Sequence, residues 1–316
     1  MKGMLSRRLP ILLPTLALAL FQTDAKAVIL AGGIGSENIT APGDDFGFNN
    51  VGVINAASGV YLGNGWVISA YHVVQNGSGG FSFSNVSFAG TPYTVNTPTA
   101  VRLQNADTSL TDLALFRLNT MPPLPEITLS LSTPDVGSNV SMLGFGRNRE
   151  AAETHWDVNT GPDPDVWTET PSAGDQQGYK WAGGNAMRWG TNNLATFNAF
   201  PLPPLAQETG VINYGLGNVT TIKSNFSDTG GSEAQAAVGD SGGGVFFKNG
   251  TQWELSGLML AVNGLNGQPA DNAVYGNETF SADIATYRGQ IVDIIPEPGS
   301  AVLLLIGAGT LLRRRR

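Results

Sequence analysis

Most of the chain consists of short apolar runs separated by Gly, Asn, Ser and Pro. Val51–Ile54 and Gly59–Leu62 are two such runs, and Trp66–Ala70 follows and continues as Tyr71–Val74. Gly63-Asn64-Gly65 stands between the second and third runs and is typical of a tight hairpin turn. Apolar runs of this length between turn residues predict β-strands.

The same pattern continues along the chain. Phe81–Phe88 alternates apolar and polar positions with period two, which predicts a half-buried strand, and Asp112–Leu118 is a compact apolar run. No segment shows sustained helical periodicity, and only Tyr287–Ile295 is predicted as a short closing helix. The fold class is therefore all-β. Further strands are predicted at Val140–Gly146, Val219–Phe226, Val245–Phe247, Trp253–Val262 and Phe280–Ile284.

A Pro-rich segment, Met121–Asp135, is the best candidate for a linker. It separates a first β-rich half, about residues 28–125, from a second half of about 138–292. Residues 147–210 are polar and contain many prolines, so we interpret them as long loops and hairpins inserted into the second half.

Composition excludes several classes of function. The 316 residues include 41 Gly and 18 Pro, with 41% hydrophobic and 13% charged residues, which fits a turn-rich globular protein. A net charge of −8 argues against a nucleic-acid partner. The absence of cysteine excludes disulfides, Cys-ligated zinc and thiol catalysis. No cofactor or metal is expected, because Asp163, Asp165 and Glu169 are better explained as a solvated acidic loop than as a calcium site.

Residues 1–27 are predicted to be a secretory signal peptide. Lys2, Arg7 and Arg8 supply positive charge, Leu9–Phe21 is apolar, and Ala25-Lys26-Ala27 matches an A-x-A cleavage site. A retained transmembrane helix is the alternative, but the apolar run is short for a span. We expect cleavage after Ala27, with Val28 as the new N-terminus, and export of the protein.

The stretch Gly239–Gly244, which reads Gly-Asp-Ser-Gly-Gly-Gly before the apolar run Val245–Phe247, holds the candidate nucleophile. A Ser between glycines can lie on a tight turn close to a substrate, and such a turn can aim two amide N–H groups at one point. The same residues also suit an ordinary hairpin turn. The segment alone does not distinguish a catalytic turn from an ordinary hairpin turn, so the other residues of the chain must be considered.

A catalytic Ser needs a base, and only His72 and His155 are available. His72 follows an apolar run, whereas His155 lies in a polar segment and is interpreted as a solvated surface residue. Asp112 opens an apolar strand, where a carboxylate is costly unless it has a partner. Each of these residues, considered alone, is as compatible with a structural role as with a catalytic one.

His72, Asp112 and Ser241 occur in the chain order of chymotrypsin-like enzymes. Trp66–Val73 resembles the segment around the histidine in that family, with Tyr71 and Val73 as departures. The run that starts at Asp112 resembles the segment around its aspartate, and Gly239–Gly243 matches its nucleophile segment. The chain is thus similar to trypsin-like serine proteases over residues 28–292.

The resemblance implies two antiparallel six-stranded β-barrels with the active site in the cleft between them. It implies that Ser241 attacks the scissile carbonyl, that His72 transfers the proton and that Asp112 orients His72. The backbone N–H groups of Gly239 and Ser241 would form the oxyanion hole. Asp240 would pair with a free N-terminus, which we expect to be Val28 once the signal peptide is removed.

Specificity departs from that of enzymes that cleave after basic residues. The position that carries an acid in those enzymes is Gln235, and Leu260, Ala261 and Val262 fall on the predicted substrate-binding strand. A neutral amide among small residues offers no partner for Arg or Lys. We therefore assign these residues to the S1 pocket and expect an uncharged P1 residue.

The C-terminal residues 296–316 begin with Pro296-Glu297-Pro298, continue with the apolar run Ala301–Leu312 and end with Arg313–Arg316. This order resembles the PEP-CTERM sorting signal of exported bacterial proteins. The resemblance implies an exosortase of the inner membrane as partner and a Gram-negative host, with the hydrophobic segment as a transient transmembrane helix. A plain C-terminal anchor is the alternative.

The sequence as a whole predicts a secreted or cell-surface serine endopeptidase, acting as a monomer on protein or peptide substrates. A catalytically silent protease-like component of the extracellular matrix, which would bind rather than cleave, is the alternative. An esterase that uses the same triad is a third.

Overall fold

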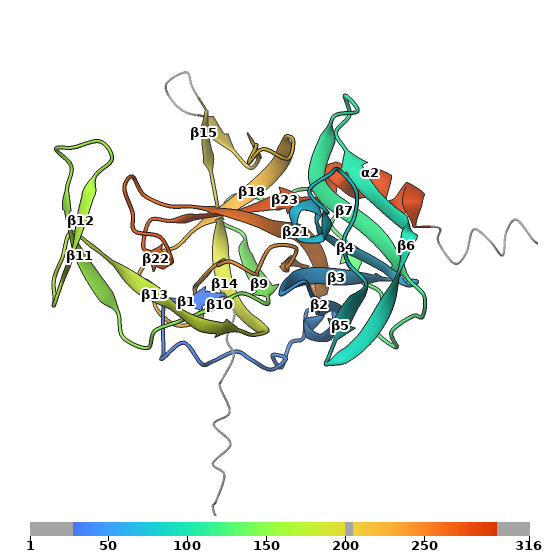
Figure 1. Ribbon diagram of the computed structural model, residues 1–316, viewed down its shortest axis with the longest axis horizontal. Coiled ribbons are helices and arrows are strands. Elements are labelled where there is room, and N and C mark those ends of the chain that lie inside the picture. The colour runs from blue at the N-terminus through green and yellow to red at the C-terminus, as the bar shows by residue number, and fades with distance from the viewer. Residues whose placement is uncertain (1–27, 200–204, 296–316) are drawn as a thin grey trace, which may run out of the picture.

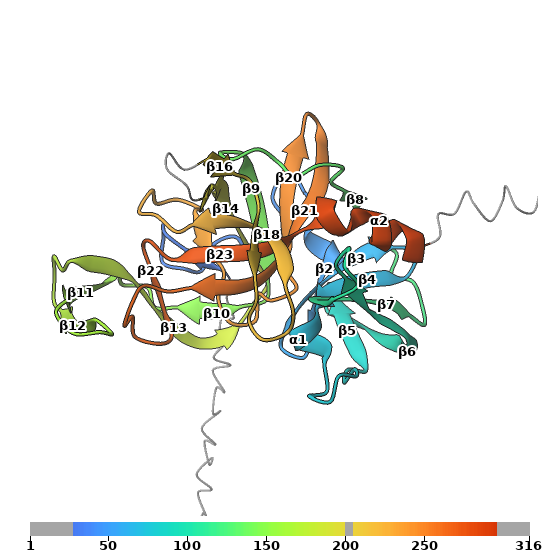
Figure 2. The same ribbon diagram turned by 90° about the horizontal axis from the view of Figure 1, so that it is seen from above.

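Two antiparallel β-barrels lie side by side in the computed structural model, which describes residues 28–199 and 205–295 (Figure 1). The N-terminal half forms one barrel and the C-terminal half the other, and the second view shows the same division (Figure 2). The predicted all-β class and the predicted pair of six-stranded barrels are both confirmed.

The first barrel closes through six strands in the order β2-β3-β4-β7-β6-β5. Its interior is filled by large apolar side chains, among them Tyr61, Phe88 and Phe116, each no more than 2% exposed. The strands are β2 (Val51–Ile54), β3 (Ala57–Gly63), β4 (Trp66–Ala70), β5 (Asn85–Phe88), β6 (Thr91–Gln104) and β7 (Leu110–Leu118).

Three details of this barrel differ from the sequence predictions. Tyr71–Val74 forms the one-turn helix α1 and does not extend β4. The strand predicted over Phe81–Phe88 begins only at Asn85. The longest strand, β6, was not predicted, because it contains Pro92 and Pro98 and leaves most of its positions exposed or half-buried. A strand of this kind shows little apolar alternation in its sequence.

The second barrel is closed by the pairing of Leu194 with Ser224, which joins β14 to β18. Val140, Met142, Ile222, Val245 and Met259 pack together inside it. Its strands are β9 (Asn139–Gly144), β14 (Arg188–Ala195), β18 (Val219–Asn225), β20 (Gly244–Asn249), β21 (Gln252–Asn263) and β23 (Glu278–Asp283).

The interpretation of residues 147–210 as loops and hairpins is wrong for β14, which is a wall of the second barrel. Its inward positions include Arg188, Gly190 and Asn192, so the strand lacks the apolar alternation that would have revealed it. The side-chain amide of Asn192 donates to the carbonyls of Asn225 and Ala234, both at 2.9 Å, so its burial is compensated by hydrogen bonds.

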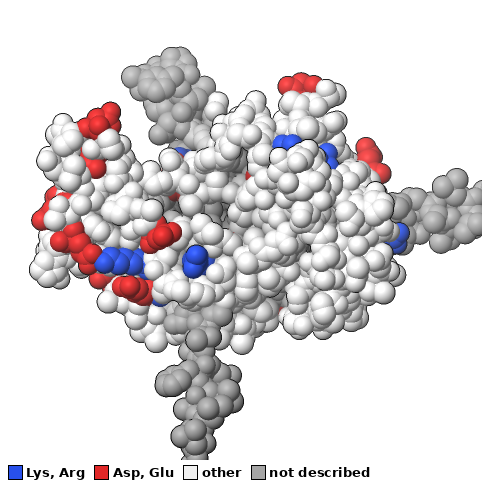
Figure 3. Space-filling model, viewed as in Figure 1, with Lys and Arg blue, Asp and Glu red and all other residues white. Residues whose placement is uncertain are grey.

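Residues 147–187 form paired strands joined by loops, among them hairpins, as predicted. Strands β11 and β12 pair with each other and project at the far end of the second barrel (Figure 1). On the face seen in Figure 3, charged side chains gather at that end, where Lys180 pairs with Glu169, and are sparse elsewhere. This sheet contains β10 (Arg147–Arg149), β11 (Thr154–Asn159), β12 (Val166–Thr170), β13 (Gln176–Asn185) and β22 (Asn272–Val274).

Short elements complete the chain. Within the predicted linker, β8 pairs in parallel with β21, so this segment is packed along the second barrel. The short strands are β1 (Ile29–Leu30), β8 (Thr128–Leu129), β15 (Phe197–Ala199), β16 (Leu205–Gln207), β17 (Gly210–Ile212) and β19 (Ala234–Gln235), and a 3-10 turn spans Phe48–Asn50.

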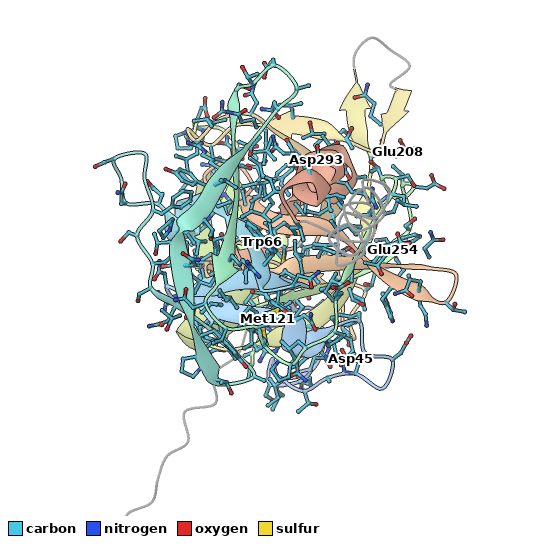
Figure 4. The ribbon with its side chains drawn as sticks, turned by 90° about the vertical axis from the view of Figure 1, so that its right-hand side faces the viewer. Asp45, Trp66, Met121, Glu208, Glu254 and Asp293 are labelled. Carbon is cyan, nitrogen blue, oxygen red and sulfur yellow. The ribbon has the colours of Figure 1, made fainter. Side chains whose placement is uncertain are left out.

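A shared core joins the two barrels. Val60 and Ile68 of the first barrel belong to the same buried cluster as Leu255 and Leu258 of β21 and Ile291 of the C-terminal helix. This helix, α2 (Ile284–Ile294), confirms the predicted closing helix and is capped by Asp283, which accepts from the N–H of Thr286. Figure 4 shows α2, which carries Asp293, on the face of the molecule that also shows Trp66 of β4 and Glu254 of β21.

Neither helix within residues 28–199 and 205–295 has the length and apolar character that crossing a membrane requires. The predicted signal peptide, residues 1–27, and the predicted sorting signal, residues 296–316, lie outside the described residues.

Candidate active site

His72 and Asp112 are joined by two hydrogen bonds. His72 lies in α1, directly after β4, and Asp112 lies in β7, which pairs with β4 so that Ala70 faces Leu113. The N–H of His72 donates to Asp112 Oδ1 at 2.8 Å, and His72 Nδ1 lies 2.6 Å from Asp112 Oδ2. A carboxylate only accepts, so Nδ1 carries the hydrogen and Nε2 of the neutral ring keeps its lone pair. His72 is thereby held in the tautomer that a general base needs.

The side chain of Asp112 is more deeply buried than that of His72. The side chain of Asp112 is 12% exposed and that of His72 is 32% exposed. The carboxylate is therefore largely shielded from water, while one side of the imidazole remains open to a substrate. Low solvent access strengthens the attraction between Asp112 and an imidazolium at His72.

Ser241 lies on the turn that leads into β20 and is pressed against the first barrel. The N–H of Ser58 in β3 donates to the carbonyl of Ser241 at 3.0 Å. The next residue, Gly242, has φ +81°, and a Cβ built on it would lie 2.2 Å from Ser58 O and 3.1 Å from the nitrogen of Ala70. Ala70 is two residues before His72. The packing of this glycine therefore brings Ser241 beside the segment that carries His72.

The hydroxyl of Ser241 makes a long contact, with Oγ 3.5 Å from the carbonyl oxygen of Leu260. Within residues 28–199 and 205–295, no hydrogen bond joins it to His72. Catalytic hydrogen bonds are often long without substrate and tighten in the complex.

Two N–H groups beside Ser241 are left available. The carbonyl of Val238 accepts from Arg147 and that of Asp240 accepts from Gly243, so the N–H groups of Gly239 and Ser241, in the same peptide units, point the opposite way. No hydrogen bond among the described residues uses either N–H as donor. A positive φ of 101° at Gly239 gives this turn its shape.

Ser58 was not singled out by the sequence, yet it ties the barrels together at this turn. Its hydroxyl donates to the carbonyl of Gly239 at 2.9 Å and accepts from the N–H of Phe145 at 2.7 Å. Ser69 in turn donates to the carbonyl of Ser58. A serine in a strand carries no sequence signal for such a role, because its partners lie in other strands.

Asp240 precedes Ser241 on this turn and is fully buried. Its Oδ2 accepts from the N–H of Ala237 at 2.7 Å. Burial raises the pKa of Asp240 to about 7, against the N–H groups of Ala237, Val28 and Gly146 and the charge of Arg188. Val28 is itself fully buried and precedes β1, which pairs with β19. The predicted N-terminal residue and its predicted partner are thus neighbours.

An apolar pocket of about 170 Å³ opens beside Ser241. It contains Leu260, Ala261 and Val262, which the sequence assigned to S1, but Gln235 lies in a neighbouring, larger pocket that shares Val262. Gln235 is 1% exposed. The pocket beside Ser241 is lined by Ala236, Ala237, Val238, Ser241, Met259, Leu260, Ala261 and Val262.

His155, the other histidine, lies in β11 and pairs with Thr170 in the projecting hairpin. It belongs to the far end of the second barrel, away from β4 and α1 (Figure 2). The half-buried position of its ring differs from the predicted solvated one.

Replacing Gly242 by alanine is expected to lower kcat by about 100-fold, because a Cβ at this position displaces Ser241 from the first barrel. The positive φ adds strain, so the free energy of unfolding should fall by about 1–3 kcal/mol. Steady-state kinetics and urea unfolding measure the two effects. Gly250→Ala is the matched control, because Gly250 also has a positive φ but nothing within 4 Å of its Cβ position. Equal kcat in the two variants would contradict the packing argument.

A family model described as a trypsin-like peptidase domain matches residues 57–258. Mouse neuropsin, a serine protease expressed in the limbic system, has a similar structure with 14% identity and a TM-score of 0.47, over 82% of this chain and 98% of that chain. A mutant of human heparin binding protein has 12% identity and a TM-score of 0.48, over 83% and 97%. An inactive form of the Rv3671c protease of M. tuberculosis has 14% identity and a TM-score of 0.42, over 78% and 90%. None of the curated proteins matches the chain.

Proposed function

The chain belongs to the trypsin-like peptidase family, and from this premise we propose that it is a secreted serine endopeptidase with Ser241 as nucleophile. The observation that carries the proposal is the doubly hydrogen-bonded pair of His72 and Asp112, at 2.8 and 2.6 Å, on the barrel edge against which the Ser241 turn packs. Nucleophilic catalysis by serine requires such an oriented base.

In the proposed mechanism, Ser241 Oγ forms a bond to the carbonyl carbon of the scissile peptide while its proton passes to His72 Nε2. Asp112 stabilises the imidazolium through the hydrogen bond from Nδ1. The carbonyl oxygen becomes an oxyanion that accepts from the N–H groups of Gly239 and Ser241. His72 then gives the proton to the leaving amine, the C–N bond breaks, and an acyl-enzyme remains on Ser241.

Hydrolysis of the acyl-enzyme repeats these steps with water in place of the Ser241 hydroxyl. A water molecule attacks the ester carbon as His72 takes one of its protons. The same two N–H groups hold the second oxyanion. The ester bond breaks, the proton returns to Ser241 Oγ, and the peptide leaves with a new carboxylate. Each peptide bond that is cleaved therefore consumes one water molecule.

Labelling by an organophosphonate probe tests this function. The purified protein is expected to bind the probe covalently at Ser241, with a mass increase on the peptide that contains it. Ser241→Ala should abolish labelling, whereas Ser58→Ala should keep Ser241 available and leave labelling detectable. Folded wild-type protein that takes up no label would favour the binding component of the matrix over the enzyme. Matched ester and amide substrates separate a peptidase from an esterase.

We expect the P1 side chain to be uncharged. The pocket beside Ser241 has a volume of about 170 Å³ and no charged side chain in its lining. A charge desolvated there finds no partner, so kcat/KM for a P1 lysine should be on the order of 100-fold below that for norleucine, which has a similar carbon chain. Two peptides that differ only at P1 provide the measurement. Equal or faster cleavage after lysine would refute the assignment of this pocket to S1.

Export and processing are part of the proposal. Removal of residues 1–27 would create an ammonium at Val28, beside Asp240, and the tail 296–316 would be removed by an exosortase at the inner membrane of a Gram-negative host. The burial of Val28 and its position next to Asp240 support the first step. N-terminal sequencing of the exported protein tests it, and any start other than Val28 speaks against it.

A further inference from the structure

One asparagine side chain lies against the turn that carries the proposed oxyanion donors. Asn185 is the last residue of β13, and its Nδ2 lies 2.6 Å from the position that a Cβ on Gly239 would take. The carbonyl oxygens of Phe145 and Ala56 lie 2.6 and 3.1 Å from the same position. Gly239 is therefore flanked by two carbonyl oxygens, with the side-chain amide of Asn185 beside them.

The amide of Asn185 joins these two carbonyls. Nδ2 donates to the carbonyl of Ala56 and to that of Phe145, both at 3.2 Å. An amide NH₂ group has two hydrogens, so each carbonyl receives one, whereas the side-chain oxygen in that place would be repelled by both. Ala56 belongs to the turn between β2 and β3 of the first barrel, and Phe145 follows β9 of the second. The amide thus bridges the two barrels at the nucleophile turn.

Strand pairing brings Asn185 to this place. Its register partner on β10 is Arg147, whose N–H donates to the carbonyl of Val238 at 2.9 Å. Because a peptide unit is planar and trans, that bond directs the N–H of Gly239 the opposite way. The edge formed by β10 and β13 therefore contacts the peptide unit that supplies one of the two proposed oxyanion donors.

The carbonyl oxygens of Ala56 and Phe145 carry partial negative charge next to Gly239. Preorganised dipoles near a developing charge have a large effect on the barrier of a reaction. A carbonyl oxygen close to the oxyanion opposes its formation, and an NH₂ group that donates to this carbonyl offsets part of the negative charge. Asn185 does so for two carbonyls at once and places its own positive end beside Gly239.

We propose that Asn185 is a positioning residue for the oxyanion hole. Its amide offsets the charge of the carbonyls of Ala56 and Phe145 and keeps the N–H of Gly239 directed at the substrate. The inserted strands β10 and β13 thereby contribute to catalysis from outside the segments that carry the triad. This inference rests on the proposed serine peptidase function.

Two variants of nearly the same shape as asparagine test the charge at this position. Asn185→Leu removes both donors, and Asn185→Asp places a negative charge there; the side chain is half-buried, so both variants are expected to fold. For a peptide with an aliphatic P1 residue, kcat should fall on the order of 30-fold in Asn185→Leu, which is less than the loss of an oxyanion donor itself causes, and further in Asn185→Asp. KM should change by less than about threefold, because the carbonyl of the bound substrate carries little charge.

Asn192→Leu is the matched control. The amide of Asn192 also donates to two main-chain carbonyls, both at 2.9 Å, but these belong to Asn225 and Ala234 and not to the segments that flank Gly239. The variant should lower the free energy of unfolding, measured in urea, because it leaves two carbonyls without their partner. The kcat of the folded protein should stay near the wild-type value.

A peptide aldehyde and the matching peptide alcohol separate positioning from general destabilisation. Ser241 Oγ adds to the aldehyde carbon, its proton passes to His72, and the former carbonyl oxygen becomes an oxyanion in the hole. The alcohol cannot form this adduct. Asn185→Leu should weaken the aldehyde by about the factor by which kcat/KM falls and leave the inhibition constant of the alcohol within about threefold of the wild-type value. Asn192→Leu should change neither constant.

Three results would each overturn the proposal: an unchanged kcat in Asn185→Leu, equal losses of kcat in Asn185→Leu and Asn185→Asp, or equal weakening of the aldehyde and the alcohol. A role in packing alone predicts the second and third of these. Folded wild-type protein that neither cleaves peptides nor takes up the phosphonate refutes the peptidase function itself, so the two failures are distinguishable.

Discussion

His72→Ala is expected to lower kcat by about 10⁶-fold, because Ser241 then has no group to accept its proton and loses its nucleophilicity. The reason is geometric. His72 is held by Asp112 through Nδ1, at 2.6 Å, so Nε2 is the only ring nitrogen left to serve Ser241. Turnover of a peptide with an aliphatic P1 residue provides the measurement, with active-site titration to count competent molecules.

His155→Ala is the matched control for this variant. It removes the other histidine of the chain, which lies in the projecting hairpin, and kcat should remain at the wild-type level. If His72→Ala kept more than a few per cent of the wild-type kcat, or if His155→Ala lost it, the assignment of the base would be wrong.

Asp112→Asn should lower kcat by about 10⁴-fold while the fold is preserved. Asp112 accepts two hydrogen bonds from His72, one from the main-chain N–H and one from Nδ1. An amide has one oxygen, so an asparagine that keeps the first bond turns its NH₂ group toward Nδ1. His72 would then place its hydrogen on Nε2, where it can no longer accept a proton from Ser241.

A suitable control is Asp107→Asn, on the turn that precedes β7. Asp107 is exposed and accepts from the N–H and hydroxyl of Ser109. Those hydrogen bonds hold the pKa of Asp107 below its usual range, so this variant also loses an ionised carboxylate, but one that makes its hydrogen bonds with Ser109 and none with His72. Its kcat should not change. A similar loss of kcat in both variants would mean that Asp112 acts through stability and not through His72.

The fold class followed from periodicity because most strands bury one face against apolar neighbours. Periodicity did not predict the strands that lack such an apolar face. Strand β14 turns Arg188, Gly190 and Asn192 inward, and β6 leaves most of its length accessible. Polar groups that are buried through hydrogen bonds with distant segments leave no apolar pattern in their own segment. Such strands can be recognised only in the tertiary structure, where their hydrogen-bond partners are known.

The sequence also predicted only part of the candidate site. Local segments identified His72, Asp112 and Ser241, since a base, an acid and a serine among glycines each occur in a characteristic surrounding. The distance of 2.6 Å between His72 and Asp112 required β4 and β7 to pair, and those strands are separated by a long stretch of chain. Ser58 has no surrounding of this kind, and its role depends on contacts with Gly239 and Phe145.

The sequence by itself determined the all-β class, the division into two halves, the chain order of the candidate triad and the absence of cysteine chemistry. These properties reside in residue types and short segments, where local patterns of hydrophobicity and backbone freedom are sufficient. Only the tertiary structure decided that Gly242 must lack a side chain and that Gln235 lies outside the pocket beside Ser241. Each of these depends on close approach of segments far apart in the chain, and packing of that kind is set by the whole fold.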